Sequence, residues 1–412
     1  MTSLAKRNDN DNLITNPDLL FKFSVDMLVV MTGLLIAGIY LNGFNAFRTA
    51  LWSVLTAVIF EDIACRITKR KDRKAHDLYA AVTGLAIALM LPATVPGYIA
   101  FFASTFAVCA VLIPFGSARK IPFVPAAAGF CFVTVCFPEA VFTYAPISVG
   151  SSSPVYGAEG FVSAESFSKM LTLGKSVFLN PLENISLLMG KNPGPMGTTC
   201  MLVLIAVGIY LLLKRKESFL ISFSFLAVCA LYAALFPRVN SGIVTSAVME
   251  LASGSLVFAA LVLLPDPFTA PSKTTGKIVY GAVAGLVCML LRRYGAYEEP
   301  VCFTVLIMNA LASTFGDYSD SILNSLVSKG VIKKRVVKFN ESAPNDVKEK
   351  KKKERVKKVK TTKKNKSSAH DIKEKAAEKK PETAALSYDD LLNFDGNSTD
   401  SSEKEESKDE NR

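Results

Sequence analysis

The hydrophobic positions of this chain fall in long runs, without the alternation of a half-buried strand or the stripe of an amphipathic helix. Ten such runs can be read from the sequence: 24–41, 49–64, 78–91, 96–115, 122–137, 198–213, 218–236, 246–264, 277–291 and 300–316. Apolar runs of about 18 residues cross a bilayer as helices, because lipid offers the backbone no other hydrogen-bond partner. The pattern predicts an all-α polytopic membrane protein with about ten transmembrane helices.

The composition favours the same class. Half of the 412 residues are hydrophobic and the mean hydropathy is +0.32, whereas a globular protein covers itself with polar surface. The eight cysteines lie in or beside the apolar runs without a CxxC pair, which indicates small packing residues kept as thiols. No nicotinamide fingerprint, P-loop, metal-ligand cluster or nucleophilic triad occurs, so we predict no metal and no complete redox enzyme in this chain.

Charges outside the runs predict the orientation. Basic residues cluster in 66–74, in 214–216 and at Lys273 and Lys277. The positive-inside rule places these loops and both termini in the cytoplasm, which requires an even number of spans. Arg292 and Arg293 would then lie outside, and we interpret them as structural or functional charges.

Weak internal symmetry divides the membrane part into two halves. Gly38 and Tyr40 recur as Gly208 and Tyr210, an offset of 170 residues. Five helices per half would make the halves inverted repeats, a plan common in transport folds. The predicted segments are an N-terminal cytoplasmic segment (1–22), a first five-helix half (23–137), an extracytoplasmic loop (138–196), a second five-helix half (197–327) and a charged tail (328–412).

The tail changes composition abruptly. Residues 333–380 are dominated by lysine, and 389–412 are acidic and rich in serine. Such tracts cannot bury a core, so we expect disorder. A basic block just inside the membrane can bind anionic lipid head groups. Nucleic-acid binding is not expected, because the lysines have no regular aromatic interleaving, with Phe339 alone among them, and no nucleic-acid-binding fold accompanies them.

Three carboxylates within the apolar runs are candidates for an ion or proton path. They are Asp26, Glu61 and Glu250. An intramembrane carboxylate costs about 2.5–3.5 kcal/mol unless it is paired or hydrated, so it is a functional candidate by default. For Glu61 and the adjacent Asp62, a structural ion pair with Arg66 is the alternative.

The stretch from Leu264 to Asn309 carries a long composite pattern. It contains Asp266-Pro267, Thr269-Ala270-Pro271, Gly276-Lys277, Arg292-x-x-Gly295-x-Tyr297-x-Glu299 and Met308-Asn309. This pattern resembles the D subunit of the bacterial Rnf electron-transport complex and its homologue, the B subunit of the sodium-pumping NADH:quinone oxidoreductase. The resemblance covers about residues 18–317.

The resemblance implies an integral subunit of a complex in the bacterial cytoplasmic membrane. Such a complex couples electron flow between reduced ferredoxin and NAD to Na⁺ or H⁺ movement. The implied partners are the other Rnf-type subunits and the lipid bilayer. The dehydrogenase chemistry would belong to those partner subunits.

The resemblance also implies flavin, as FMN or riboflavin. The family attaches FMN to the last threonine of (Ser/Thr)-Gly-Ala-Thr, where this chain has Ser163-Ala164-Glu165-Ser166. A second flavin motif, Asn-Pro-Phe-Asn-Pro-Ala, reads Ile121-Pro122-Phe123-Val124-Pro125-Ala126 here. The candidate flavin positions are Ser166 for covalent FMN, and Thr198, Asp266, Thr269 and Phe123. The alternatives are a surface serine at Ser166 and a helix cap at Thr198.

Two hypotheses therefore remain open. The chain is either a working redox subunit with flavin in a divergent pocket, or a flavin-free scaffold, assembly subunit or inverted-repeat permeation protein. The departures at Ile121, Val124, Ser166 and Thr198 all fall on cofactor-associated positions. Both hypotheses assume that the chain is a subunit of an Rnf-type complex.

Overall fold

The computed structural model describes residues 17–70, 72–115, 121–147, 153–174, 189–239, 242–271 and 273–328. These residues form helices and no strand, and one isolated antiparallel bridge joins Tyr144 and Ala164. The predicted all-α class is confirmed for this part of the chain. Nearly all of the predicted tail, 329–412, and most of the N-terminal segment lie outside the described residues.

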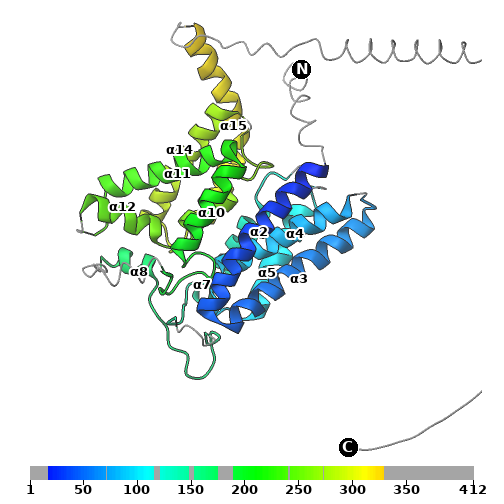
Figure 1. Ribbon diagram of the computed structural model, residues 1–412, viewed down its shortest axis with the longest axis vertical. Coiled ribbons are helices and arrows are strands. Elements are labelled where there is room, and N and C mark those ends of the chain that lie inside the picture. The colour runs from blue at the N-terminus through cyan, green and yellow to red at the C-terminus, as the bar shows by residue number, and fades with distance from the viewer. Residues whose placement is uncertain are drawn as a thin grey trace, which may run out of the picture. The chain divides into compact units, whose positions relative to one another are not determined.

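The first group of helices packs together and is blue to cyan in Figure 1. Its members are α2 (Pro17–Asn42), α3 (Phe44–Ile67), α4 (Arg73–Met90), α5 (Gly97–Phe106), the π-helical η2 (Ala107–Leu112) and α6 (Pro125–Cys136). Two short helices follow, α7 (Pro138–Val141) and α8 (Phe167–Thr172). They lie in the segment that the sequence predicts as an extracytoplasmic loop.

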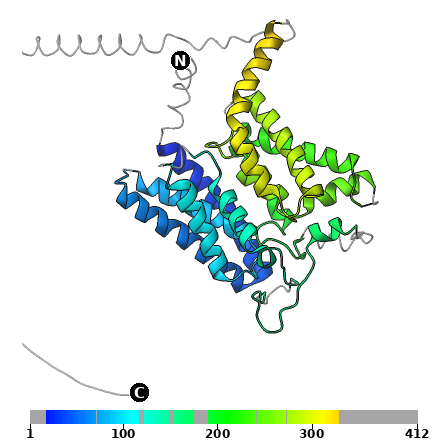
Figure 2. The same cartoon turned by 180° about the vertical axis from the view of Figure 1, so that it is seen from behind.

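The second group is green to yellow, and Figure 2 shows both groups from behind. Its members are α10 (Met201–Lys214), α11 (Lys216–Leu235), α12 (Ile243–Ala252), α13 (Leu256–Phe258), the π-helical η3 (Ala259–Leu263), α14 (Thr274–Tyr294) and α15 (Val301–Ser328). Each apolar run predicted from the sequence overlaps a helix in one of the two groups.

Small residues allow close helix contacts in both groups. A Cβ on Gly84 would lie 2.8 Å from the Ser53 carbonyl oxygen, and one on Gly285 would lie 2.8 Å from that of Phe225. Lipid tails are as apolar as leucine, so helices in a bilayer associate largely through such close packing. These glycines fix how α3 packs on α4 and how α11 packs on α14.

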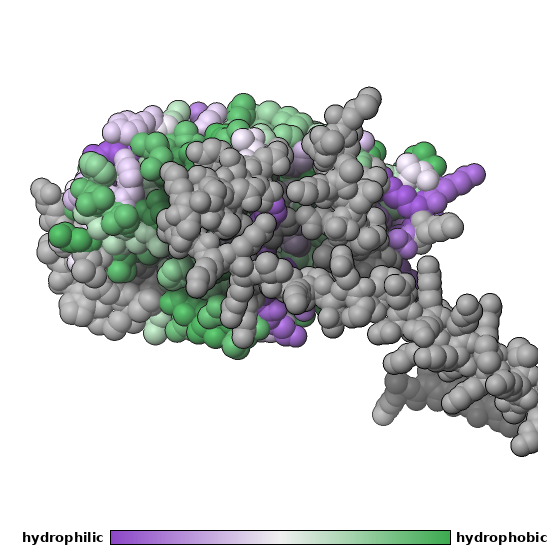
Figure 3. Space-filling view, turned by 90° about the horizontal axis from the view of Figure 1, so that it is seen from above, coloured by the Kyte–Doolittle hydropathy of each residue, from purple (hydrophilic) through white to green (hydrophobic). Residues whose placement is uncertain are grey.

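In the part of the chain that the structure describes, three helices are long and apolar enough to cross a membrane: Leu19–Asn42, Ser218–Leu235 and Thr274–Tyr294. A fourth span results if Thr245–Ala252 and Leu256–Val262, which are bent by 65° at a short break, are taken together. Large apolar side chains also face outward, as along α3, and Figure 3 shows apolar patches on the visible surface. Soluble monomers rarely expose so much apolar surface, so the fold is consistent with a membrane protein.

Candidate functional site

The site centres on the break between α12 and α13. The chain bends at Ser253-Gly254-Ser255, where Gly254 has φ 64°, a conformation that L side chains rarely adopt. A break leaves the last carbonyls of one helix and the first N–H groups of the next without partners. Glu299 provides a partner at the start of the second helix. Its Oε2 accepts hydrogen bonds from the N–H and from the Oγ of Ser255, both at 3.0 Å.

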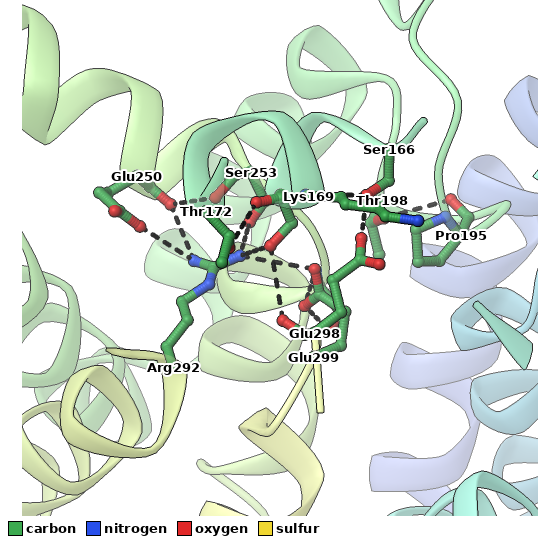
Figure 4. A network of polar contacts seen from close by, with 12 residues as sticks. Ser166, Lys169, Thr172, Pro195, Thr198, Glu250, Ser253, Arg292, Glu298 and Glu299 are labelled. Carbon is green, nitrogen blue, oxygen red and sulfur yellow. Dashed lines mark hydrogen bonds and ion pairs between the residues drawn. The ribbon is translucent and has the colours of Figure 1, made fainter. Parts of the chain in front are cut away.

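Arg292, at the end of α14, pairs the carbonyls on the other side of the break. Its Nη1 donates to the Glu250 carbonyl at 3.1 Å, and its Nη2 donates to the Ser253 carbonyl at 2.7 Å. The side chain is 1% exposed and lies 3.4 Å from Glu299 Oε1 (Figure 4). A cation at a helix C-terminus and an anion at a helix N-terminus both match the helix dipoles.

Glu250 belongs to the same buried cluster. Arg238 donates to both of its carboxylate oxygens, at 2.6 Å in the Nη2–Oε2 bond, and Arg292 Nη1 lies 3.6 Å from Oε2. The structure thus places this candidate for the ion path between two arginines. It is 3% exposed.

Helix α8 lies against this cluster through its N-terminal serines. Ser166 Oγ caps α8 by accepting from the Lys169 N–H at 3.0 Å and donates to Glu298 Oε1. Ser168 Oγ donates to the Glu298 carbonyl at 3.4 Å and accepts from Arg292 Nη2 at 3.2 Å. Burial, with the charge of Glu299 adding to it, raises the pKa of Glu298 to about 8.

A pocket with about 330 Å³ of empty space lies beside Ser166. Its lining includes Thr198, Glu298 and Glu299, so the structure brings Ser166 and Thr198 together. Thr198 Oγ1 donates to the Pro195 carbonyl at 3.1 Å, and α10 begins only at Met201. The alternative that Thr198 caps this helix is therefore wrong.

Asp266 lies at a second pocket, which has about 310 Å³ of empty space and also includes Val124. Its carboxylate accepts from the Tyr79 hydroxyl and from the Phe268 N–H, both at 2.9 Å. Burial raises the pKa of Asp266 to about 6, although the two hydrogen bonds lower it.

The other two candidate flavin residues lie outside the lining of both pockets. Thr269 is buried, and its Oγ1 has no hydrogen-bond partner in the described part of the chain. Phe123 is half-buried just before α6. The five candidate flavin positions are therefore divided rather than gathered in one site.

The residues at Ser166 do not fit a phosphoester-linked flavin. The Ser166 hydroxyl is engaged with a helix cap and with Glu298, and a phosphate on Oγ would share the pocket with the carboxylate of Glu299. Phosphate sites normally present cations or N–H groups to the ligand.

The pocket at Asp266 does not fit a flavin ring either. The Asp266 oxygens already accept two hydrogen bonds. Ile121 and Val124, which stand where the family has asparagines, are buried in the apolar core. A ring system bound there would lack the amide donors and acceptors that two asparagines would supply.

Glu61 and Asp26 lie elsewhere, each with partners of its own. Glu61 Oε1 lies 3.0 Å from Arg70 Nη1 and 3.5 Å from His76 Nδ1, while its buried Oε2 has no hydrogen-bond partner among the described residues. Asp26 lies 3.7 Å from Arg215. The structure does not bring Asp26, Glu61 and Glu250 into one cluster.

The ion pair expected for Arg66 is made by the neighbouring carboxylate. Arg66 Nη2 lies 2.7 Å from Asp62, and Arg73 also pairs with Asp62. Glu61 instead points to Arg70 and His76.

Sequence reasoning missed several residues of these clusters, notably Arg238, Glu298 and Arg70. The Arg-x-x-Gly-x-Tyr-x-Glu pattern already indicated part of this cluster. Its first and last residues are Arg292 and Glu299, which face each other across the helix break. The partners Ser168, Ser253 and Ser255 come from segments remote in sequence. A pattern within one segment cannot reveal them.

Comparisons with known proteins cover most of the chain. The model of the NQR2, RnfD, RnfE family matches residues 11–321. The D subunit of the proton-translocating ferredoxin:NAD(+) oxidoreductase complex of Clostridium ljungdahlii is 24% identical over 304 residues, 73% of this chain and 90% of that protein. The D subunit of the ion-translocating oxidoreductase complex of Alcanivorax borkumensis is 26% identical over 288 residues, 67% of this chain and 84% of that protein.

A further relative agrees with these two. The D subunit of the ion-translocating oxidoreductase complex of Stutzerimonas stutzeri is 28% identical over 294 residues, 66% of this chain and 83% of that protein. The family model spans every helix described above except the last seven residues of α15, and it includes the break and its buried charges. The chain belongs to the NQR2, RnfD, RnfE family.

Proposed function

We propose that this chain is the integral membrane D subunit of an Rnf-type complex, which couples electron flow between ferredoxin and NAD to Na⁺ or H⁺ movement. The observation that carries the proposal is the family match over residues 11–321, which includes every described helix apart from the end of α15. The three relatives are each named as the D subunit of an oxidoreductase complex that translocates ions or protons. The partners are the other subunits of that complex.

In this proposal the chain crosses the bacterial cytoplasmic membrane ten times as two inverted five-helix repeats, with both termini in the cytoplasm. Each predicted run overlaps a helix, and the shorter helices span with the help of flanking residues and neighbours. The broken α12–α13 segment supports a transport-type architecture, because such folds carry discontinuous helices at their functional centres. The lysine-rich tail binds anionic lipid on the cytoplasmic side.

A flavin-free role as scaffold or permeation subunit is favoured by one observation. The Ser166 hydroxyl is engaged with Glu298 and with the α8 backbone, so it is not presented as an attachment point for phosphate. Electron transfer then belongs to partner subunits, while this chain organises the membrane part. Glu61, with one unpaired buried oxygen, is the strongest of the three candidates for an ion path.

The test is purification of the tagged full-length chain from its own membranes in mild detergent. Co-purification of further membrane and soluble subunits, with ferredoxin-dependent NAD⁺ reduction, is expected. A chain recovered alone from membranes that retain this reductase activity would contradict the proposal. Flavin fluorescence in the denatured gel band would refute the flavin-free role while leaving the subunit assignment intact.

A further inference from the structure

The oxygen atoms at the helix break converge on a single cation. The guanidinium of Arg292 lies 3.1 and 2.7 Å from the carbonyls of Glu250 and Ser253, and 3.2 Å from Ser168 Oγ. Carboxylate oxygens of Glu299 and Glu250 lie at 3.4 and 3.6 Å. Four residues thus direct five oxygens at one group, as Figure 4 shows in part.

These oxygens are held in place by contacts that do not involve Arg292. Glu299 is fixed by two hydrogen bonds from Ser255 through its other oxygen, and the Glu250 carboxylate is fixed by Arg238. A Cβ on Gly254 would overlap Glu299 Oε1, so only glycine leaves room for this carboxylate. Loss of the Arg292 side chain would therefore leave a formed, oxygen-lined cavity.

The charge of the cluster fits one monovalent cation. Glu250 and Glu299 carry two negative charges, and Arg238 and Arg292 carry two positive charges. Without Arg292 the cluster would be one positive charge short. Half-helix carbonyls at a helix break bind cations in transport proteins, and here the carbonyls of Glu250 and Ser253 have that position.

We propose that the break between α12 and α13 is a monovalent-cation site that the guanidinium of Arg292 occupies as a tethered cation. The side chain closes the break, so that a free cation reaches these oxygens only if Arg292 moves out. When the Arg292 side chain is absent, the site binds a small planar cation, and guanidinium fits it best. This inference concerns the chain alone and does not depend on assembly with partner subunits.

The test uses the full-length Arg292→Ala variant in detergent. Its Tm should fall by about 10 °C, because removing one partner of a buried pair leaves an uncompensated charge. Millimolar guanidinium chloride should restore about half of that loss, and urea or choline chloride should restore none. Guanidinium normally lowers Tm, so a rise is specific.

Arg293→Ala is the matched control. Arg293 is the neighbouring exposed arginine and donates to the Phe236 carbonyl at 2.9 Å. The variant loses the same charge, and its Tm should fall little and should not rise with guanidinium. The double variant Arg292→Ala, Glu299→Gln should lose the rescue, because the carboxylate that faces the cation is gone.

The proposal is wrong if guanidinium raises the Tm of Arg292→Ala no more than choline does. If too little of that variant folds, Arg292→Lys replaces it. An ammonium cannot reach carbonyls and carboxylates on both sides of the break, so this variant should melt below the wild type. Wild-type stability in Arg292→Lys would overturn the proposal. Neither outcome would affect the subunit assignment, which is tested by co-purification.

Discussion

Glu250 and Glu61 are both buried carboxylates in helices, but their surroundings differ. Glu250 is paired through both oxygens with Arg238 and also faces Arg292. Glu61 uses one oxygen for Arg70 and His76, and its second oxygen has no hydrogen-bond partner among the described residues. Both carboxylate oxygens of Glu250 therefore have partners, whereas one carboxylate oxygen of Glu61 remains available to a proton or an ion.

The difference separates two reasons for keeping a charge in a membrane helix. A buried carboxylate matched by two guanidinium groups has its desolvation offset, and it joins segments that are distant in sequence. A buried carboxylate with an unpaired oxygen retains a cost that only a proton, ion or water can relieve. We therefore interpret Glu250 as part of a structural cluster and Glu61 as the candidate for ion movement.

The largest effect is expected for Glu250→Ala. The buried Arg292 and the half-buried Arg238 would lose their shared carboxylate, which should lower the stability by about 3–5 kcal/mol. Thermal unfolding in detergent measures this, with Glu159→Ala in the exposed loop as the control. If the Glu250→Ala protein had the same melting temperature as the wild type, the structural interpretation of this cluster would be wrong.

A smaller loss of stability is expected for Glu61→Gln. The amide keeps a hydrogen-bond acceptor for Arg70 but loses the charge, so the loss should be about 1–3 kcal/mol. Ion uptake by the assembled complex should fall much more than the melting temperature suggests. Asp62→Asn is the control, because Asp62 pairs with Arg66 and Arg73 at the surface, where ion pairs contribute little. Equal ion uptake in both variants would contradict the role of Glu61.

The pH dependence of stability should contain a contribution from Glu298. Its pKa is about 8 in the folded chain against an ordinary value of 4.5, so the folded chain keeps a proton that the unfolded chain releases. Stability from this group is complete below pH 4.5 and is lost as the pH rises to about 8, with a slope of at most about 1.4 kcal/mol per pH unit. Melting curves of Glu298→Gln should show a flatter pH dependence than the wild type. An identical slope would show that Glu298 does not hold the proton.

The smallest effect is expected for Ser166→Ala. Loss of the α8 cap should cost about 0.5–1 kcal/mol, and the flavin content of the purified chain should not change. Ser163→Ala, an exposed serine of the same loop, is the control. Flavin that stays with the denatured wild type and disappears only in Ser166→Ala would establish covalent attachment and refute our interpretation of this pocket.

The sequence predicts the helices well, because a long apolar run in lipid can pair its backbone N–H and C=O groups only by forming a helix. It predicts the Asp266 turn and the Arg292–Glu299 motif because both are local patterns. It does not predict that Ser166 meets Glu298, 132 residues away, since such a contact depends on tertiary packing. The cap expected at Thr198 failed for a local reason: α10 begins three residues later, at Met201.

Ion uptake into inverted membrane vesicles tests the central claim most directly. Vesicles from cells that lack this gene should show no uptake driven by reduced ferredoxin and NAD⁺, and a plasmid copy of the wild-type chain should restore it. The Glu61→Gln copy should restore assembly and NAD⁺ reduction but not uptake. Undiminished uptake in vesicles without the chain would contradict its assignment as a subunit of the ion-translocating complex.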